Sequence, residues 1–113
     1  MKTFRIPIQV VLYREEDQWI AHCLQFDVCG HGDTKRDAFL LLAEAITIQV
    51  EQAIEHKNLK NLFSPADGKY FQMFAAGKNI TKGELKMNFV PVDSVILEEP
   101  EAREYCEDDL VLA

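Results

Sequence analysis

Gly30-His31-Gly32-Asp33-Thr34 is the stretch that decides the fold, since it separates a run of predicted strands from a long predicted helix. Thr34 can cap that helix, because its hydroxyl accepts a hydrogen bond from an amide of the first turn. Asp37 completes a variant of the capping box, and with Asp33 it places negative charge at the positive end of the helix dipole. The two glycines allow a sharp turn, with positive φ if needed. A dinucleotide-phosphate fingerprint would need a third glycine, which is missing.

Three strands are predicted before this stretch. Apolar residues alternate along residues 3–13, which is typical of a strand with one buried face. Pro7 cannot donate to a strand ladder, so we expect an edge position or a bulge there. Residues 19–24 and 28–31 are the second and third strands. Their connections are too short for a parallel crossover, which predicts an antiparallel meander.

One long helix is predicted over residues 35–56, because apolar residues recur there at helical spacing. They are Phe39, Leu42, Ala43, Ile46, Val50, Ala53 and Ile54. Other apolar residues widen this stripe and predict that the helix is covered on more than one side: Ala38, Leu41, Ala45 and Ile48. We expect the helix to pack across the sheet.

The remaining chain divides into three segments. Residues 58–83 are an aromatic-rich connection with a short helix from about Pro65 to Ala76, ended by Gly77. They form a satellite core that closes one end of the sheet, or alternatively a hydrophobic patch for a partner. Residues 84–98 have strand character but are interrupted at Pro91 and Asp93-Ser94, which predicts either one bent strand or two. A fourth strand here that pairs back to the first would complete the sheet. Residues 99–113 are an acidic tail, either solvated and mobile or an arm for a basic partner.

The predicted fold class is therefore α+β, in the order β-β-β-α-β, with an antiparallel sheet, one long helix, a short second helix and an acidic C-terminal tail. Residues 1–98 form a single domain, and residues 99–113 form the tail. The length of 113 residues suits one domain with a modest core.

Charge and composition narrow the function classes. The net charge of −7 and the pI of about 4.9 disfavour direct nucleic-acid binding and favour a basic partner. No signal peptide and no long apolar run is present, so we expect a cytoplasmic protein that does not enter a membrane. Three cysteines without a repeated spacing suit a reduced compartment.

Two sets of side chains invite a metal hypothesis. His22, Cys23, Cys29 and His31 lie on neighbouring strands, where His22 and Cys29 can face each other while Cys23 points to the opposite face. Their spacing is not that of a zinc finger, and buried thiols commonly act as small apolar residues, so no metal site is predicted. The second set ends predicted strands, where metal-dependent nucleases can place ligands: Asp17, Asp27 and Asp33.

Several motifs carry a resemblance to a known family. They are Trp19-Ile20-Ala21-His22-Cys23-Leu24, Asp27-Val28, Gly32-Asp33-Thr34, and Ala38 with Leu42-Ala43-Glu44-Ala45-Ile46. Over residues 4–55 the chain resembles the N-terminal domain of the HicB-like antitoxins. The resemblance implies a β-β-β-α-β fold similar to a partial ribonuclease H fold. It also implies binding of HicA, a small basic RNA-cleaving toxin shaped like a double-stranded-RNA-binding domain.

The resemblance has limits in this sequence. Members often carry a C-terminal DNA-binding segment, but the last thirty or so residues here are strand-like and then acidic, so DNA binding is not implied. No carboxylate set matching a ribonuclease H site can be identified, so no catalytic activity and no cofactor is expected. The family commonly forms dimers or tetramers, and an edge strand near Pro7 or residues 85–89 could serve as the interface.

The sequence thus predicts a non-enzymatic protein-binding module that covers the RNA-binding face of a small basic toxin. The expected contacts are acidic or aromatic: Glu15, Glu16, Asp17, Trp19, Glu98 and Glu99. One alternative is a stand-alone homo-oligomeric scaffold or small-ligand binder without a toxin. A further alternative is a metal-dependent nuclease.

Overall fold

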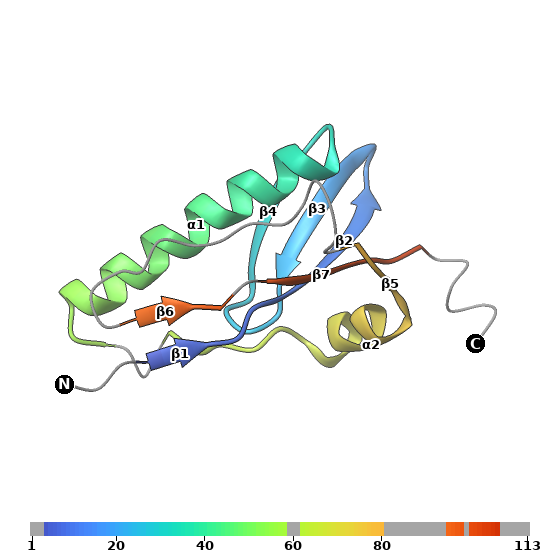
Figure 1. Ribbon diagram of the computed structural model, residues 1–113. Helices are drawn as coiled ribbons and strands as arrows, with labels where there is room; N and C mark the ends of the chain where they lie inside the picture. The colour runs from blue at the N-terminus through green and yellow to red at the C-terminus, as the bar shows by residue number, and fades with distance from the viewer. Residues whose placement is uncertain (1–3, 59–61, 81–94, 99, 107–113) are drawn as a thin grey trace.

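The computed structural model describes residues 4–58, 62–80, 95–98 and 100–106. A mostly antiparallel sheet forms the middle layer (Figure 1). The long helix α1 (Lys35–Glu55) crosses one face of the sheet, and the short helix α2 (Gly68–Ala76) lies on the other face. The predicted α+β class with one long and one short helix is confirmed. Within the described part of the chain, no helix is both long and apolar enough to cross a membrane.

Seven strands are present among the described residues. They are β1 (Phe4–Ile6), β2 (Gln9–Glu15), β3 (Gln18–Cys23), β4 (Val28–Gly32), β5 (Lys78–Asn79), β6 (Val95–Leu97) and β7 (Glu101–Glu104). Five of them form one sheet in the order β4-β3-β2-β7-β5, while β1 and β6 pair separately. β2, β3 and β4 form the predicted antiparallel meander. β7 runs parallel to β2, and β6 runs parallel to β1.

The predicted first strand is divided at Pro7 into β1 and β2. Two backbone hydrogen bonds keep the neighbouring chain aligned across this break: the Glu98 amide donates to the Ile6 carbonyl, and the Glu101 amide donates to the Ile8 carbonyl, each at 2.9 Å. Because Pro7 has no N–H, the strand ladder is interrupted at that residue. Pro7 therefore marks a joint between two parallel pairings.

The C-terminal part of the prediction needs two corrections. The fourth strand was expected within residues 84–98, of which residues 84–94 lie outside the described part. In the described end of this segment, β6 does pair with β1, which belongs to the predicted first strand. The strand that joins the main sheet is β7, inside the segment predicted as a tail from residue 99, so the expected domain boundary at 98 is wrong. Ala102 is fully buried on the α1 side of the sheet, and Tyr105 is buried on the α2 side. The strand also pairs in parallel with β2, so it does not extend the antiparallel meander.

α1 begins as predicted, with the Thr34 hydroxyl accepting a hydrogen bond from the Asp37 amide at 3.0 Å. Gly30 in β4 has a different role from the expected one. A methyl group at Gly30 would overlap with the carbonyl oxygen of Ala38 and the amide nitrogen of Leu42, both in the α1 backbone. Gly30 thus permits close approach of helix and sheet, and it does not adopt positive φ.

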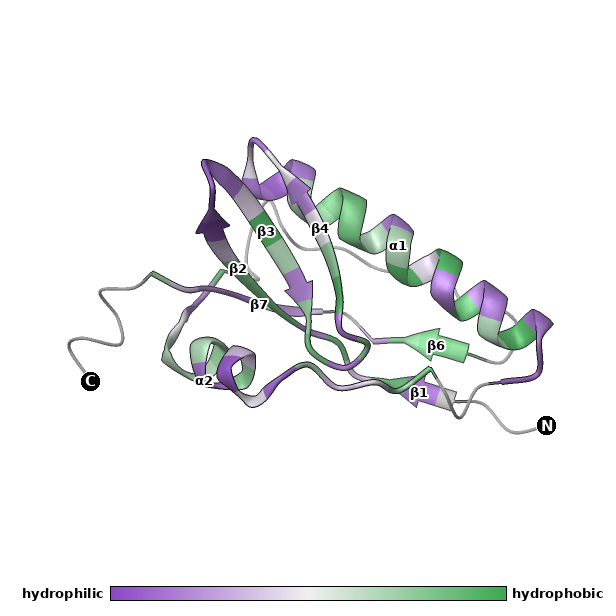
Figure 2. Ribbon diagram, turned by 180° about the vertical axis from the view of Figure 1, so that it is seen from behind, coloured by the Kyte–Doolittle hydropathy of each residue, from purple (hydrophilic) through white to green (hydrophobic). Residues whose placement is uncertain are grey.

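The outer side of α1 is exposed, although the sequence predicted that the helix is covered on more than one side. Leu40, Leu41 and Ile48 remain 41%, 40% and 54% exposed. Figure 2 shows hydrophobic and hydrophilic segments alternating along the helix. The buried side of α1 does pack on the sheet, through Ala38, Phe39, Leu42, Ile46 and Val50.

A second apolar cluster lies beneath α2. It joins Phe74 of the helix to Val11, Leu24, Ala66 and Tyr105. The predicted satellite core is therefore present, but it covers the second face of the sheet and does not close one end. α2 stops at Gly77, as predicted, where the backbone becomes extended with φ of −76° and ψ of 166°. A methyl group at this position would come within 2.9 Å of the Glu104 carbonyl oxygen.

Candidate functional site

The tip of the β2–β3 hairpin carries three of the predicted contact residues. Glu15 pairs with Gln18, which leaves a two-residue loop of Glu16 and Asp17 with φ of 50° and 66°. Two positive φ values are characteristic of a type I′ turn, where Asn-Gly is strongly preferred. All three acidic side chains are exposed. None of them takes part in the ion pairs found between described residues. The tip is thus an unneutralised acidic projection.

Trp19 lies beside the tip and is held between charged side chains. The Arg14 guanidinium is 5.3 Å and the Lys35 ammonium 5.0 Å from the centre of its ring, both within range of a cation–π contact. Lys35 also forms an ion pair with Glu104 of β7 at 2.6 Å. Trp19 packs in part against the core beneath α1. Its first role is therefore to join the hairpin to the start of α1 and to β7.

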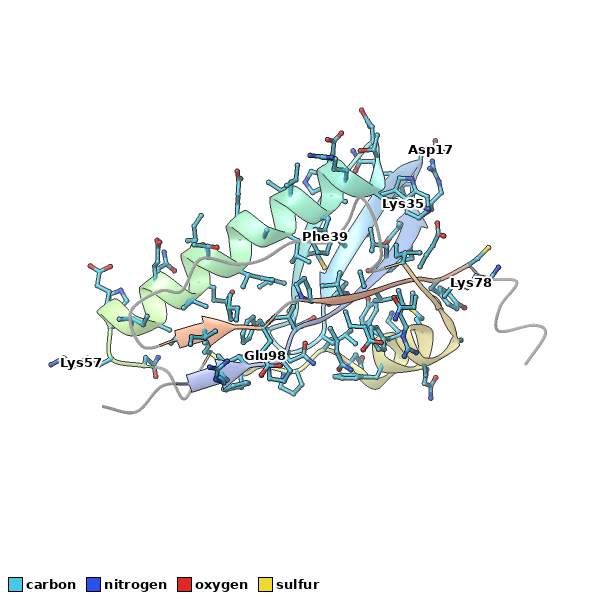
Figure 3. All side chains as sticks on the ribbon, viewed as in Figure 1. Asp17, Lys35, Phe39, Lys57, Lys78 and Glu98 are labelled. Atoms are coloured by element: carbon cyan, nitrogen blue, oxygen red, sulfur yellow. The ribbon has the colours of Figure 1, made fainter. Side chains whose placement is uncertain are left out.

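Glu98 is exposed but lies far from the tip. Its amide bonds to Ile6, whereas Glu15 lies nine positions further along the first strand segment, so roughly 30 Å separates them at about 3.3 Å per residue. Figure 3 shows Asp17 and Glu98 in different parts of the molecule. Glu99 lies outside the described residues. The structure therefore brings Glu15, Glu16, Asp17 and Trp19 together, and Glu98 does not join them.

A buried histidine cluster lies on the α2 face of the sheet. His22 is 3% exposed, and its Nε2 is 2.7 Å from Oδ1 of Asp27. Its Nδ1 is 3.3 Å from the Tyr13 hydroxyl, and the Tyr70 ring of α2 lies 4.2 Å from the imidazole. Burial is the main cause that raises the pKa of the Tyr13 phenol, which therefore stays protonated and can donate to His22.

This cluster connects three parts of the fold. Asp27 has φ of 53°, and its carboxylate accepts from the buried imidazole, so the turn between β3 and β4 is fixed to the sheet. The Tyr70 ring brings α2 onto the same imidazole. Because the imidazole is enclosed, His22 is placed to hold the turn and α2 together and is not placed to meet a substrate.

The thiol geometry follows the sequence prediction in part. His22 and Cys29 are directly opposite each other on β3 and β4, and Cys23 packs in the core beneath α1, as expected. Burial raises the pKa of Cys23 to about 11. Partial burial and then the charge of Asp27 raise the pKa of Cys29 to about 11. These raised pKa values make the thiolate that a metal would bind more costly to form at either residue. Among the described residues no three His, Cys, Asp or Glu side chains converge as metal ligands.

The predicted carboxylate set of Asp17, Asp27 and Asp33 is not assembled. Asp17 precedes β3 and Asp33 follows β4, so both lie at one end of the antiparallel pair. Asp27 lies at the other end, about 20 Å away along the six residues of β3, and it binds His22. The strand-end carboxylates behind the nuclease alternative therefore do not lie together, because the meander reverses direction between them.

Sequence reasoning missed the histidine cluster as a unit. Strand alternation places Tyr13 and His22 on one face of the sheet, and Asp27 follows shortly after in the sequence. The sequence pattern therefore indicated that Tyr13 and His22 lie near each other. No sequence pattern indicated that Tyr70 joins them, since its position depends on how α2 folds back on the sheet.

Comparisons with models of known protein families, with curated proteins and with solved structures found no match.

Proposed function

We propose that this chain is a non-enzymatic, cytoplasmic protein-binding module. It neutralises a small basic RNA-cleaving protein by covering that protein's RNA-binding face, as the resemblance of residues 4–55 to HicB-like antitoxins implies. The meander of β2, β3 and β4, followed by α1 and later by β7, contains the β-β-β-α-β order of that family, to which this chain adds β1, α2, β5 and β6. The net charge of −7 is complementary to a basic partner.

The observation that carries this proposal is the acidic hairpin tip. Glu15, Glu16 and Asp17 project from the end of the sheet with no ion-pair partner among the described residues. Glu16 and Asp17 also occupy left-handed backbone positions where glycine or asparagine would be less strained. These acidic side chains therefore make the turn less stable than glycine or asparagine would. Residues that lower stability in this way suit a role in recognition better than a role in folding.

The tip would act mainly on the rate of association. Exposed charges attract an oppositely charged protein over about one Debye length, close to 8 Å at physiological salt. Such charges raise the association rate constant more than they strengthen the final complex. Bound to a basic RNA-binding face, the module would exclude RNA by occupying the same positive surface.

Charge reversal of the tip tests this mechanism. Glu15→Lys, Glu16→Lys and Asp17→Lys together should slow association with the basic partner at least about tenfold at low salt and flatten its salt dependence. The matched control is the triple change to glutamine, which should give an intermediate rate. RNA cleavage by the partner should stop at one equivalent of the wild-type chain. Unchanged association kinetics in the lysine variant would contradict the proposal.

A second candidate is a homo-oligomeric scaffold, which one feature of the sheet favours. β4 pairs only with β3 among the described strands, so its outer edge offers backbone groups to another chain. Light scattering separates the candidates: a stable multiple of 13.0 kDa with no basic protein recovered from cells would favour the scaffold.

A further inference from the structure

The outer side of α1 combines exposed apolar residues with a row of carboxylates. Leu40, Leu41 and Ile48 are all at least 40% exposed. Beside them lie acidic residues spaced by seven and then four positions, which places them along one line of the helix: Asp37, Glu44, Glu51 and Glu55. All four are exposed, and none forms an ion pair with another described residue. We call this surface the α1 outer face.

No basic residue balances this row within the helix. Lys35 and Arg36 are its only cations, both in the first turn, and the last turn has none. Glu51 and Glu55 are four residues apart, where like charges destabilise a helix. They also lie near the negative end of the helix dipole, where carboxylates are unfavourable. The row therefore opposes helix stability in its C-terminal half, so folding does not account for it.

The α1 outer face is unsuited to most occupants. A second copy of this chain would bring the same row of carboxylates against it. Nucleic acids and anionic membranes carry the same sign of charge and would be repelled. A segment with Lys or Arg beside apolar side chains matches both features, because its charges meet the carboxylates while its apolar groups cover Leu41 and Ile48.

We propose that the α1 outer face is the docking surface for a basic, amphipathic segment of a separate protein. This inference rests on the proposed function and gives the basic partner a place to bind. The hairpin tip lies at the same end of the molecule as the start of α1, as the contact between Trp19 and Lys35 shows (Figure 3). The tip then governs approach, and the α1 outer face governs how long the complex lasts.

The inference is tested with a synthetic peptide of lysine and leucine in a helical pattern as probe. Its dissociation constant and its dissociation rate constant are measured for the full chain and three double variants. Glu44→Lys/Glu51→Lys reverses two charges of the face, and Leu41→Asn/Ile48→Asn removes its apolar part. Glu15→Lys/Glu16→Lys is the matched control, since it makes the same change in net charge at the tip. Melting curves verify that each variant folds.

We expect both α1 variants to weaken binding at least about tenfold at physiological salt, mainly through faster dissociation, and the tip variant to raise the dissociation rate constant no more than about threefold. Equal weakening by the tip and α1 charge variants would overturn the inference, because net charge alone would explain binding. Wild-type affinity in the Leu41→Asn/Ile48→Asn variant would also overturn it. The inference would be overturned as well if the wild-type chain formed a homodimer and the Leu41→Asn/Ile48→Asn variant were a monomer.

The two proposals can fail separately. If a basic protein is recovered from cells and only tip variants lose it, the proposed function stands and the inference is wrong. If no basic protein is recovered but the peptide binds through α1, the inference stands and the proposed antitoxin function is wrong. Loss of a recovered partner in both α1 variants supports the two together.

Discussion

At the scale of single residues, close packing decides what each position tolerates. Gly30 lies directly against the α1 backbone, and His22 is enclosed by Tyr13, Asp27 and Tyr70. The sequence indicated a special role for Gly30 but suggested a turn, because a glycine pattern does not distinguish positive φ from close approach. Only the position of α1 reveals which of the two applies.

Gly30→Ala should destabilise the protein by about 1–3 kcal/mol, because the new methyl group must displace the backbone of α1. The control is Gly68→Ala in the first turn of α2, where a methyl group meets nothing within 4 Å. That change should be neutral or slightly stabilising. Urea denaturation of both variants measures the difference, and equal stabilities would contradict the packing described here.

Asp27→Ala should cost about 1–3 kcal/mol, because the buried His22 imidazole loses its acceptor and alanine is strained at a φ of 53°. Asp27→Asn should cost clearly less, since asparagine tolerates that backbone and keeps a side-chain carbonyl acceptor. Chemical denaturation measures both. A larger loss in Asp27→Asn than in Asp27→Ala would show that the hydrogen bond is not what matters.

Alkylation of Cys29 should accelerate about tenfold for each pH unit from 7 to 10 without levelling. Its pKa is raised to about 11, so the reactive thiolate is a small fraction throughout this range and grows in proportion to hydroxide. The assay uses Cys106→Ser, which removes the other exposed thiol. A plateau near pH 9 would mean an ordinary thiol and would contradict the raised pKa of Cys29.

At the scale of elements, two segments carry acidic residues against their own stability. The hairpin loop of Glu16 and Asp17 adopts positive φ without glycine, and the C-terminal half of α1 carries Glu51 and Glu55 without a cation. Helix and hairpin were both predictable from sequence, because caps and alternation are local signals. Their unfavourable charges become apparent only when exposure and ion pairs are known.

Asp17→Gly should stabilise the protein by about 0.5–1 kcal/mol, because glycine adopts φ of 66° without strain. Asp17→Ala is the control for charge, since it removes the carboxylate but keeps a Cβ, and it should not give this gain. Thermal unfolding at a fixed pH compares them. Equal stabilisation by alanine would assign the effect to charge repulsion.

Glu51→Lys/Glu55→Lys should raise the melting temperature, because it places cations at the negative end of α1. The expected gain is about 0.5–1 kcal/mol. The same variant should bind the basic lysine–leucine peptide more weakly. Opposite changes in stability and affinity are the expected signature of residues kept for binding. A variant that is less stable and also binds less well would contradict this assignment.

At the scale of the whole molecule, the sequence predicted the meander, the long helix and the second helix, because each follows from local periodicity and capping. It did not predict β7, in which Ala102 is the only uncharged residue of four. Two charges of that strand make tertiary contacts, since Glu104 pairs with Lys35 and Arg103 donates to the Phe74 carbonyl, while Glu101 pairs with Arg103 within the strand itself. A hydrophobic pattern does not indicate such contacts, so the sequence of residues 99–113 was interpreted as a solvated acidic tail.

The candidate site, like the fold, was predictable from the sequence only in part. The acidic tip followed from its place between two strands. The separation of Glu98 from that tip depends on strand pairing across Pro7, which the sequence did not reveal. The α1 outer face was expected to be covered, since exposed and buried apolar positions look alike along a helix.

The central claim is that an acidic surface binds a basic protein, and affinity capture tests it most directly. The tagged chain is used to capture proteins from its native cells at low salt, and bound material is eluted with rising salt and identified by mass. The account predicts a small basic protein that is released by salt and is not captured by the Glu44→Lys/Glu51→Lys variant. Recovery of this chain alone, at a multiple of 13.0 kDa, would contradict the account.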